Sequence, residues 1–295
     1  MPEGLDIVGL LILFAGTAAL VAFWSRGCLR RDALADGPVR ATGLGAADIV
    51  MGLALWLAGQ LAVGLLLLPA LGAEPGPEMR RQLTLPYAYF VLLAQVTTYA
   101  PPSIYLLLRV ALVSRGPHLA GLDGIRQLGL GLGDGGQLLR LTGLAVLGGV
   151  PLVAAVLSAT RLVSHLIGQP APTVAHDLLE YIATVDVLAE LLALILAAVV
   201  LAAVLEEIFF RGLIQGALVA ILGPAWRWTA VIIVALAFAL VHIGGVPWQA
   251  LPGLLALGVI LGWVYEKSGS LWPAIGLHAA FNALNIVLVR AGVVE

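Results

Sequence analysis

Apolar residues run in long stretches along this chain, and polar residues gather in the short segments between them. Stretches near the length of about 20 residues that a helix needs to cross a bilayer lie near residues 5–24, 47–71, 87–112, 143–167, 188–222, 228–246, 250–266 and 271–290. The sequence therefore predicts an all-α, polytopic membrane protein of about eight transmembrane helices.

The first stretch also has the position of a signal peptide. The residues before it, MPEGLD, contain no basic residue, and no clear small-residue cleavage site precedes Phe23 and Trp24. A signal peptide is expected to have both features. We therefore predict that this stretch is a membrane helix.

Composition supports a membrane protein and excludes other classes. The 295 residues are 61% hydrophobic and 11% charged, with a mean hydropathy of +1.05, which is too apolar for a soluble domain. The net charge of −2 argues against a nucleic-acid partner. The single cysteine, Cys28, cannot form an internal disulfide, and we interpret it as a bystander thiol.

Basic residues predict how the helices are oriented in the membrane. The predicted helices assign most basic residues to one side of the membrane: Arg26, Arg30, Arg31, Arg40, Arg109, Arg115, Arg126, Arg140, Arg211, Arg227 and Lys267. The other side has only Arg80, Arg81, Arg161 and Arg290. Because Lys and Arg resist translocation, the richer side is predicted to be cytoplasmic. The amino terminus is then predicted to lie outside.

Two longer connections separate the apolar stretches. Residues 114–142 mix Leu, Ile and Arg with turn residues, and we expect an interfacial, partly helical connector. Residues 169–186 begin with a proline-rich turn and continue as a short amphipathic helix, which we place on the outer surface.

Two carboxylates and an arginine interrupt the fifth apolar stretch, in the run LEEIFFRG. A charge at bilayer depth costs at least about 2.5 to 3.5 kcal/mol on insertion scales, so such residues point to a functional site. Glu207 and Arg211 are four residues apart and share a helix face, where they can form an ion pair. Glu206 points elsewhere, and we interpret it as the functional carboxylate, able to act as a general base and then as an acid. A purely structural charge cluster is the alternative.

Two later apolar stretches add further polar groups. His242 ends the sixth stretch in FALVHIGG, and His278 and Asn282 share a face of the eighth in HAAFN. A lone histidine in an apolar helix is more often a core residue, but an imidazole beside a carboxamide needs polar partners. Gln60 and Gln95 are explained more readily by helix packing than by cavity lining. His118, His165 and His176 lie in or near connections, and we assign them no role.

The depth of these groups decides whether they can meet. At about 1.5 Å per residue, Glu206 lies roughly 24 Å and His242 roughly 21 Å from the predicted cytoplasmic ends of their helices. His278 lies only roughly 10 Å from its own cytoplasmic end. Direct contact therefore requires tilted or displaced helices.

Glu206, His242 and His278 offer one carboxylate and two imidazoles, which suit either a hydrolytic zinc site or a metal-free acid–base site. There is no HExxH motif, and no Ser or Cys is credibly paired with these histidines. An activated water is then the expected nucleophile, and His278 with Asn282 is expected to stabilise the oxyanion.

Three motifs resemble those of one known family. EEIFFR resembles an EExxxR motif, FALVH an FxxxH motif and HAAFN an HxxxN motif. In this order they resemble the CPBP family of CAAX prenyl endopeptidase-like and bacteriocin-processing intramembrane proteases. The resemblance covers about residues 187–290, within a C-terminal helical core at 143–295 that follows N-terminal helices and a connector at 1–142.

This resemblance implies roles for the site residues. Glu206 would activate water with the assistance of His242, or these residues and His278 would bind a divalent metal, with zinc as the expected ion. His278 and Asn282 would stabilise the oxyanion, and Glu207 and Arg211 would support the site. A metal-free mechanism stays open.

We therefore expect an intramembrane endopeptidase that cleaves a membrane-associated peptide or protein in a cavity open to the cytoplasm or the adjacent leaflet. The Ala, Leu and Gly richness favours a bacterial inner membrane, which makes a prenylated substrate doubtful. Two alternatives are a non-catalytic binding or bacteriocin-immunity protein of the same fold and a proton-coupled transporter. Substrate identity and oligomeric state are not predicted.

Overall fold

The computed structural model describes residues 7–38, 42–76, 78–113, 121–131, 134–169 and 177–292. Within these residues the chain is helical, with one isolated bridge between Ile243 and Val246 and no strand. The α-helices are α1 (Ile7–Ser25), α2 (Ala46–Ala62), α3 (Leu68–Ala70), α4 (Met79–Gln82), α5 (Tyr87–Val113), α6 (Gly121–Gln127), α7 (Gly135–Leu166), α8 (Asp177–Thr184), α9 (Leu188–Ile195), α10 (Ala202–Glu207), α11 (Gly216–Leu222), α12 (Arg227–Leu240), α13 (Leu251–Ser268) and α14 (Leu271–Arg290). Three π-helical segments, η1 (Val63–Leu67), η2 (Leu196–Leu201) and η3 (Ile208–Gln215), continue these helices, and the 3-10 turns η4 (Pro224–Trp226) and η5 (Trp248–Ala250) join others.

Six helical stretches of the described chain are long and apolar enough to cross a membrane: Ala46–Ala70, Tyr87–Leu112, Gly135–Leu166, Leu188–Leu222, Trp248–Ser268 and Leu271–Arg290. The predicted all-α polytopic membrane fold is confirmed. The predicted number of eight spans is not, because the other two apolar helices, Gly9–Ser25 and Pro224–Leu240, are shorter. A 17-residue helix is only about 26 Å long, slightly less than the hydrocarbon layer.

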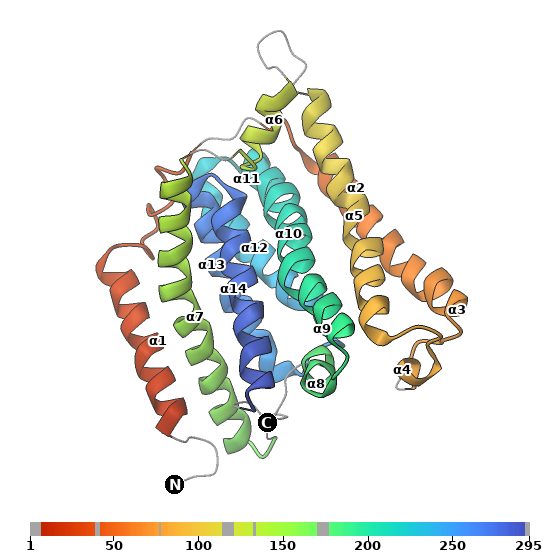
Figure 1. Cartoon of the computed structure of the whole chain (residues 1–295). Coiled ribbons are helices and arrows are strands. Elements are labelled where there is room, and N and C mark those ends of the chain that lie inside the picture. The colour runs from red at the N-terminus through yellow and green to blue at the C-terminus, as the bar shows by residue number, and fades with distance from the viewer. Residues whose placement is uncertain are drawn as a thin grey trace.

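The long helices run up and down in one bundle (Figure 1). The beginning of α1, the end of α14 and helix α8 lie at one end, which we call the α8 end. Helix α6 and the end of α11 lie at the opposite end, which we call the α6 end.

The core of the bundle surrounds the helices that carry the motifs. Phe209, Phe210 and Phe238 are at most 1% exposed, and their rings meet edge to face, with centroids 5.0 Å apart for the first two and 5.3 Å for the last two. Helices α12 and α13 approach closely at Gly258, where a β-carbon would lie 3.0 Å from the α-carbon of Ala235. Tight packing of this kind fixes the directions of the polar side chains between these helices.

The connector predicted at residues 114–142 is helical in part, as α6 and the beginning of α7. After α6 the chain turns at Gly129, whose φ of +87° favours glycine. The Gly129 carbonyl accepts hydrogen bonds from the Leu271 amide at 2.9 Å and from the Ser270 hydroxyl at 3.0 Å. This turn therefore fixes where α14 begins.

The short helix predicted in residues 169–186 is α8. Arg290 donates to the carbonyls of Ile182, Ala183 and Val185, which a helix leaves without partners at its carboxyl end. The Tyr181 hydroxyl donates to Glu190 at 2.8 Å. Burial, followed by this hydrogen bond and the Glu190 charge, raises the pKa of Tyr181 to about 12, so its hydroxyl stays a donor that holds α8 against α9.

Candidate active site

The Glu207–Arg211 ion pair predicted from the sequence is present. The Arg211 guanidinium donates to Glu207 Oε1 at 2.8 Å and to the Gly258 carbonyl at 3.2 Å, and both charged side chains are fully buried. The guanidinium also lies 4.8 Å from the centroid of the Phe238 ring, a favourable cation–π distance. Because the pair is internally neutral and hydrogen-bonded, it can exist in an apolar interior.

Glu207 also holds His278. The distance between His278 Nδ1 and Glu207 Oε1 is 2.9 Å, and the imidazole is 4% exposed. A carboxylate oxygen accepts, so Nδ1 carries the proton and Nε2 is the ring nitrogen left for other chemistry. One buried carboxylate therefore orients both the arginine and the histidine of two different motifs.

The depth mismatch expected for His278 does not keep it from the motif of the fifth apolar stretch, since its Nδ1 lies 2.9 Å from Glu207. At the start of α14, Leu271 is fully buried, and its amide donates to the Gly129 carbonyl in the turn that follows α6. The Tyr265 hydroxyl donates to the Leu128 carbonyl at 3.3 Å and secures the same turn. The start of α14 is thus held against the turn that follows α6, and His278 lies two turns further along the same helix.

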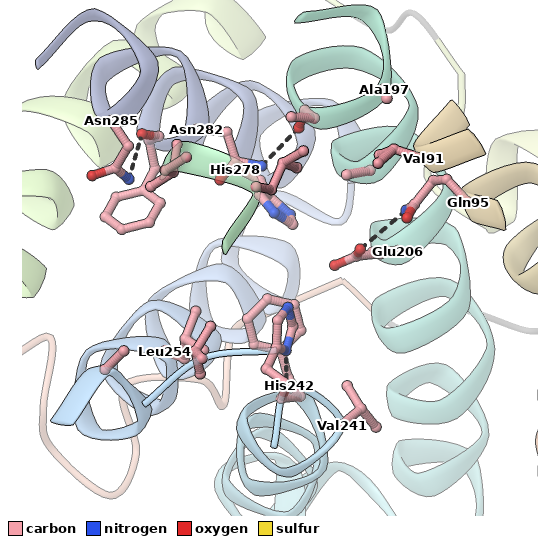
Figure 2. A pocket seen from close by; sticks show the side chains of 18 of the residues that line it. Val91, Gln95, Ala197, Glu206, Val241, His242, Leu254, His278, Asn282 and Asn285 are labelled. Carbon is pink, nitrogen blue, oxygen red and sulfur yellow. Dashed lines mark hydrogen bonds between the residues drawn. The ribbon is translucent and has the colours of Figure 1, made fainter. Parts of the chain in front are cut away.

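Glu206 points away from the ion pair, as predicted. Its Oε1 accepts a hydrogen bond of 3.1 Å from the Gln95 amide on α5, and its carboxylate points into a cavity (Figure 2). The helix carrying both glutamates is interrupted on either side by η2 and η3, and π-helical interruptions occur frequently at functional sites. The sequence did not reveal these interruptions.

His242 lies on the turn that follows α12. Its Nδ1 lies 2.7 Å from the Phe238 carbonyl oxygen. A carbonyl only accepts, so Nδ1 is the donor and Nε2 of the neutral ring is an acceptor. The imidazole of His242 faces the same cavity as Glu206 and His278 (Figure 2).

Asn282 lies one turn after His278 and also lines the cavity. Its amide donates to the Ala198 carbonyl at 2.8 Å. Ala198 belongs to η2, where a π-helical turn changes the usual backbone pairing, so Asn282 both satisfies this carbonyl and joins α14 to η2. The second hydrogen of its amide nitrogen is a further donor.

The cavity has a volume of about 430 Å³ and is lined mostly by apolar side chains. Its polar lining consists of Glu206, His242, His278, Asn282, Gln60, Gln95, Thr98, Tyr87, Tyr99 and Asn285. Apolar walls with a few converging polar groups are typical of a ligand site. Of the other histidines, His165 lies at the end of α7 and does not line the cavity, while His118 and His176 lie outside the described residues.

Gln60 and Gln95 both line the cavity, although helix packing was the favoured explanation for each from the sequence. Gln95 in addition binds Glu206. A polar side chain in the middle of an apolar helix was the available signal, but nothing in the sequence connects α5 with α10. The contact joins residues 111 positions apart.

The predicted metal ligands do not form a metal-binding group here. Among the described residues, no three side chains of His, Cys, Asp or Glu come together as such a group. We therefore derive no chemical step through a metal, and the zinc site stays a prediction.

Residues 188–284 match a family model described as Rce1-like, type II CAAX prenyl endopeptidase Rce1-like. This part of the chain, which we call the Rce1-like segment, is therefore similar to that family. The match confirms the predicted resemblance to CAAX proteases, and the Rce1-like segment contains all six predicted site residues, but not Gln95. No curated protein and no solved structure matched the chain.

Proposed function

We propose that this protein is an intramembrane endopeptidase that hydrolyses a peptide bond in a membrane-associated peptide or protein. One observation carries the proposal: Glu206, His242 and His278 face one cavity, and each is oriented by a separate group. Gln95 binds Glu206, the Phe238 carbonyl binds His242, and Glu207 binds His278. The Rce1-like segment supports a protease of the CAAX type.

In the proposed reaction, a water molecule in the cavity donates one hydrogen bond to Glu206 and another to Nε2 of His242. Glu206 removes a proton while the water oxygen attacks the carbonyl carbon of the scissile bond. The resulting oxyanion receives hydrogen bonds from His278 Nε2 and from the amide of Asn282. Glu206 then returns the proton to the amide nitrogen as the carbon–nitrogen bond breaks, which gives a carboxylic acid and an amine.

To stabilise the oxyanion, His278 must donate a hydrogen bond from Nε2. Its Nδ1 already donates to Glu207, so Nε2 is a donor only when the imidazole carries both protons. A metal ligand would instead need the neutral ring, so the two mechanisms require different states of the same residue.

The test is cleavage of a fluorogenic membrane-peptide library by the detergent-solubilised chain. Glu206→Gln is expected to lower kcat at least about 100-fold, as for other general bases. Glu180→Gln, on an exposed part of α8, is the matched control and is expected to cleave normally. Full cleavage by Glu206→Gln would contradict the role of this carboxylate.

Two further experiments distinguish the metal mechanism and the non-catalytic binding protein from the proposed function. Chelator treatment, followed by single added metals, tests zinc: loss of cleavage that one metal restores would favour the metal mechanism. Binding of library peptides without any cleavage by the wild-type chain would favour the non-catalytic binding protein.

A further inference from the structure

The lining of the cavity lies toward the end of the bundle that carries few basic residues. Among the described residues, eight Lys and Arg lie toward the α6 end: Arg26, Arg30, Arg31, Arg109, Arg126, Arg140, Arg227 and Lys267. Four lie toward the α8 end: Arg80, Arg81, Arg161 and Arg290. Arg211 belongs to neither group because it is buried in its ion pair. Because basic residues favour the cytoplasmic side, this distribution predicts that the α6 end is cytoplasmic.

The cavity lining comes from the opposite half of the bundle. It includes the first turns of α5, with Tyr87 and Phe90, and two leucines of α8, Leu178 and Leu179. It also includes the turn after α12 and the second half of α14, to Ile286. Each of these segments lies at or toward the α8 end (Figure 1).

The interior between the site and the α6 end is closed. Leu213, Leu128 and Leu271 are fully buried directly beyond the ion pair. Closer to the α6 end, Gln215 donates to Glu266 at 2.9 Å, and both side chains are fully buried. No cavity residue belongs to this closed part of the bundle.

We propose that the site takes its substrate from the extracytoplasmic side, as an apolar segment of an exported or outer-leaflet peptide or membrane protein. The proposal rests on the endopeptidase function above and replaces the expectation of a cavity open to the cytoplasm. That expectation conflicts with an outside amino terminus, since the cavity and the beginning of α1 lie at the same end. A substrate presented from the cytoplasm would meet the closed end of the bundle.

The orientation is tested first, without any need for activity. Cys28 is the single cysteine of the chain and lies after α1, on the side assigned to the cytoplasm. In intact bacterial cells, a membrane-impermeant maleimide is expected to leave the natural chain unlabelled and to label it after lysis. In a Cys28→Ala background, Glu180→Cys at the α8 end is expected to be labelled before lysis, and Asp32→Cys only afterwards. The reverse pattern would overturn the proposal.

Access is tested second, with a peptide that the solubilised chain cleaves, made impermeant by a sulfonated tag. Right-side-out vesicles are expected to cleave it at least about tenfold faster than inverted vesicles, and detergent is expected to abolish the difference. Preferential cleavage by inverted vesicles would overturn the sidedness and leave the endopeptidase function intact. Absence of cleavage in detergent, with the labelling pattern as expected, would contradict the endopeptidase function and leave the orientation standing.

Discussion

The carboxylate of Glu207 lies 2.9 Å from Nδ1 of His278, although 71 residues separate them in the chain. The same carboxylate oxygen accepts the Arg211 guanidinium at 2.8 Å. Adjacent glutamates therefore have different surroundings: Glu207 joins two helices inside the core, while Glu206 borders the cavity.

Glu207→Gln is expected to destabilise the protein as well as to reduce cleavage. The substitution leaves the fully buried Arg211 without a compensating charge, and breaking a buried pair in this way costs about 3 to 5 kcal/mol. Thermal unfolding in detergent measures the loss. Unchanged stability would contradict a central role for this ion pair.

A matched control for that experiment is Glu78→Gln. Glu78 forms an exposed ion pair with Arg81 at 3.0 Å. Exposed pairs contribute about 0 to 1 kcal/mol, so this variant is expected to unfold almost like the wild type.

Gln95→Met is expected to lower kcat roughly tenfold and to leave KM nearly unchanged. Methionine keeps the length of the side chain but cannot donate to Glu206, and a hydrogen bond to a charged group contributes about 1.5 to 3 kcal/mol. Steady-state cleavage separates the two constants.

Gln137→Met makes the same substitution at an exposed position near the start of α7 and is expected to leave both constants unchanged. A rise in KM alone for Gln95→Met would show that Gln95 binds substrate and does not position the carboxylate.

The sequence predicted those features that depend on periodicity within one helix. The spacing of Glu207 and Arg211 predicted their ion pair, and the rotation between adjacent residues predicted that Glu206 points elsewhere. The apolar stretches predicted the long helices to within a few residues at most ends.

Features that depend on how distant segments pack were not predictable from those patterns. The contact between His278 and Glu207 joins helices 71 residues apart, and the partner of Glu206 comes from α5, where no local pattern marks it. The side on which the cavity opens follows only from the placement of α8 and the turn after α12 relative to the motif helices.

Gly258→Ala is expected to destabilise the protein by about 1 to 3 kcal/mol, the usual cost of overpacking. The new methyl group would lie 3.0 Å from the backbone of Ala235 and would push α13 away from α12. It would also displace the Gly258 carbonyl that accepts Arg211. Gly64→Ala is the control, since a β-carbon there meets nothing within 4 Å, and its thermal unfolding is expected to show no loss.

Ser270→Ala tests whether the beginning of α14 sets the position of His278. The Ser270 hydroxyl donates to the Gly129 carbonyl and accepts from the Trp272 amide, as the cap of the helix. Loss of such a cap costs about 1 kcal/mol, and we expect kcat to fall several-fold because the helix start loosens.

Ser25→Ala, which removes an exposed hydroxyl at the end of α1, is the matched control and is expected to change neither stability nor cleavage. The nuclear magnetic resonance signal of the His278 Nδ1 proton offers a direct measurement. This proton is hydrogen-bonded to Glu207 only while α14 keeps its position along the bundle. If Ser270→Ala lowers stability but leaves both that signal and kcat unchanged, the level of His278 is set by the core packing around α14 and not by its first turn.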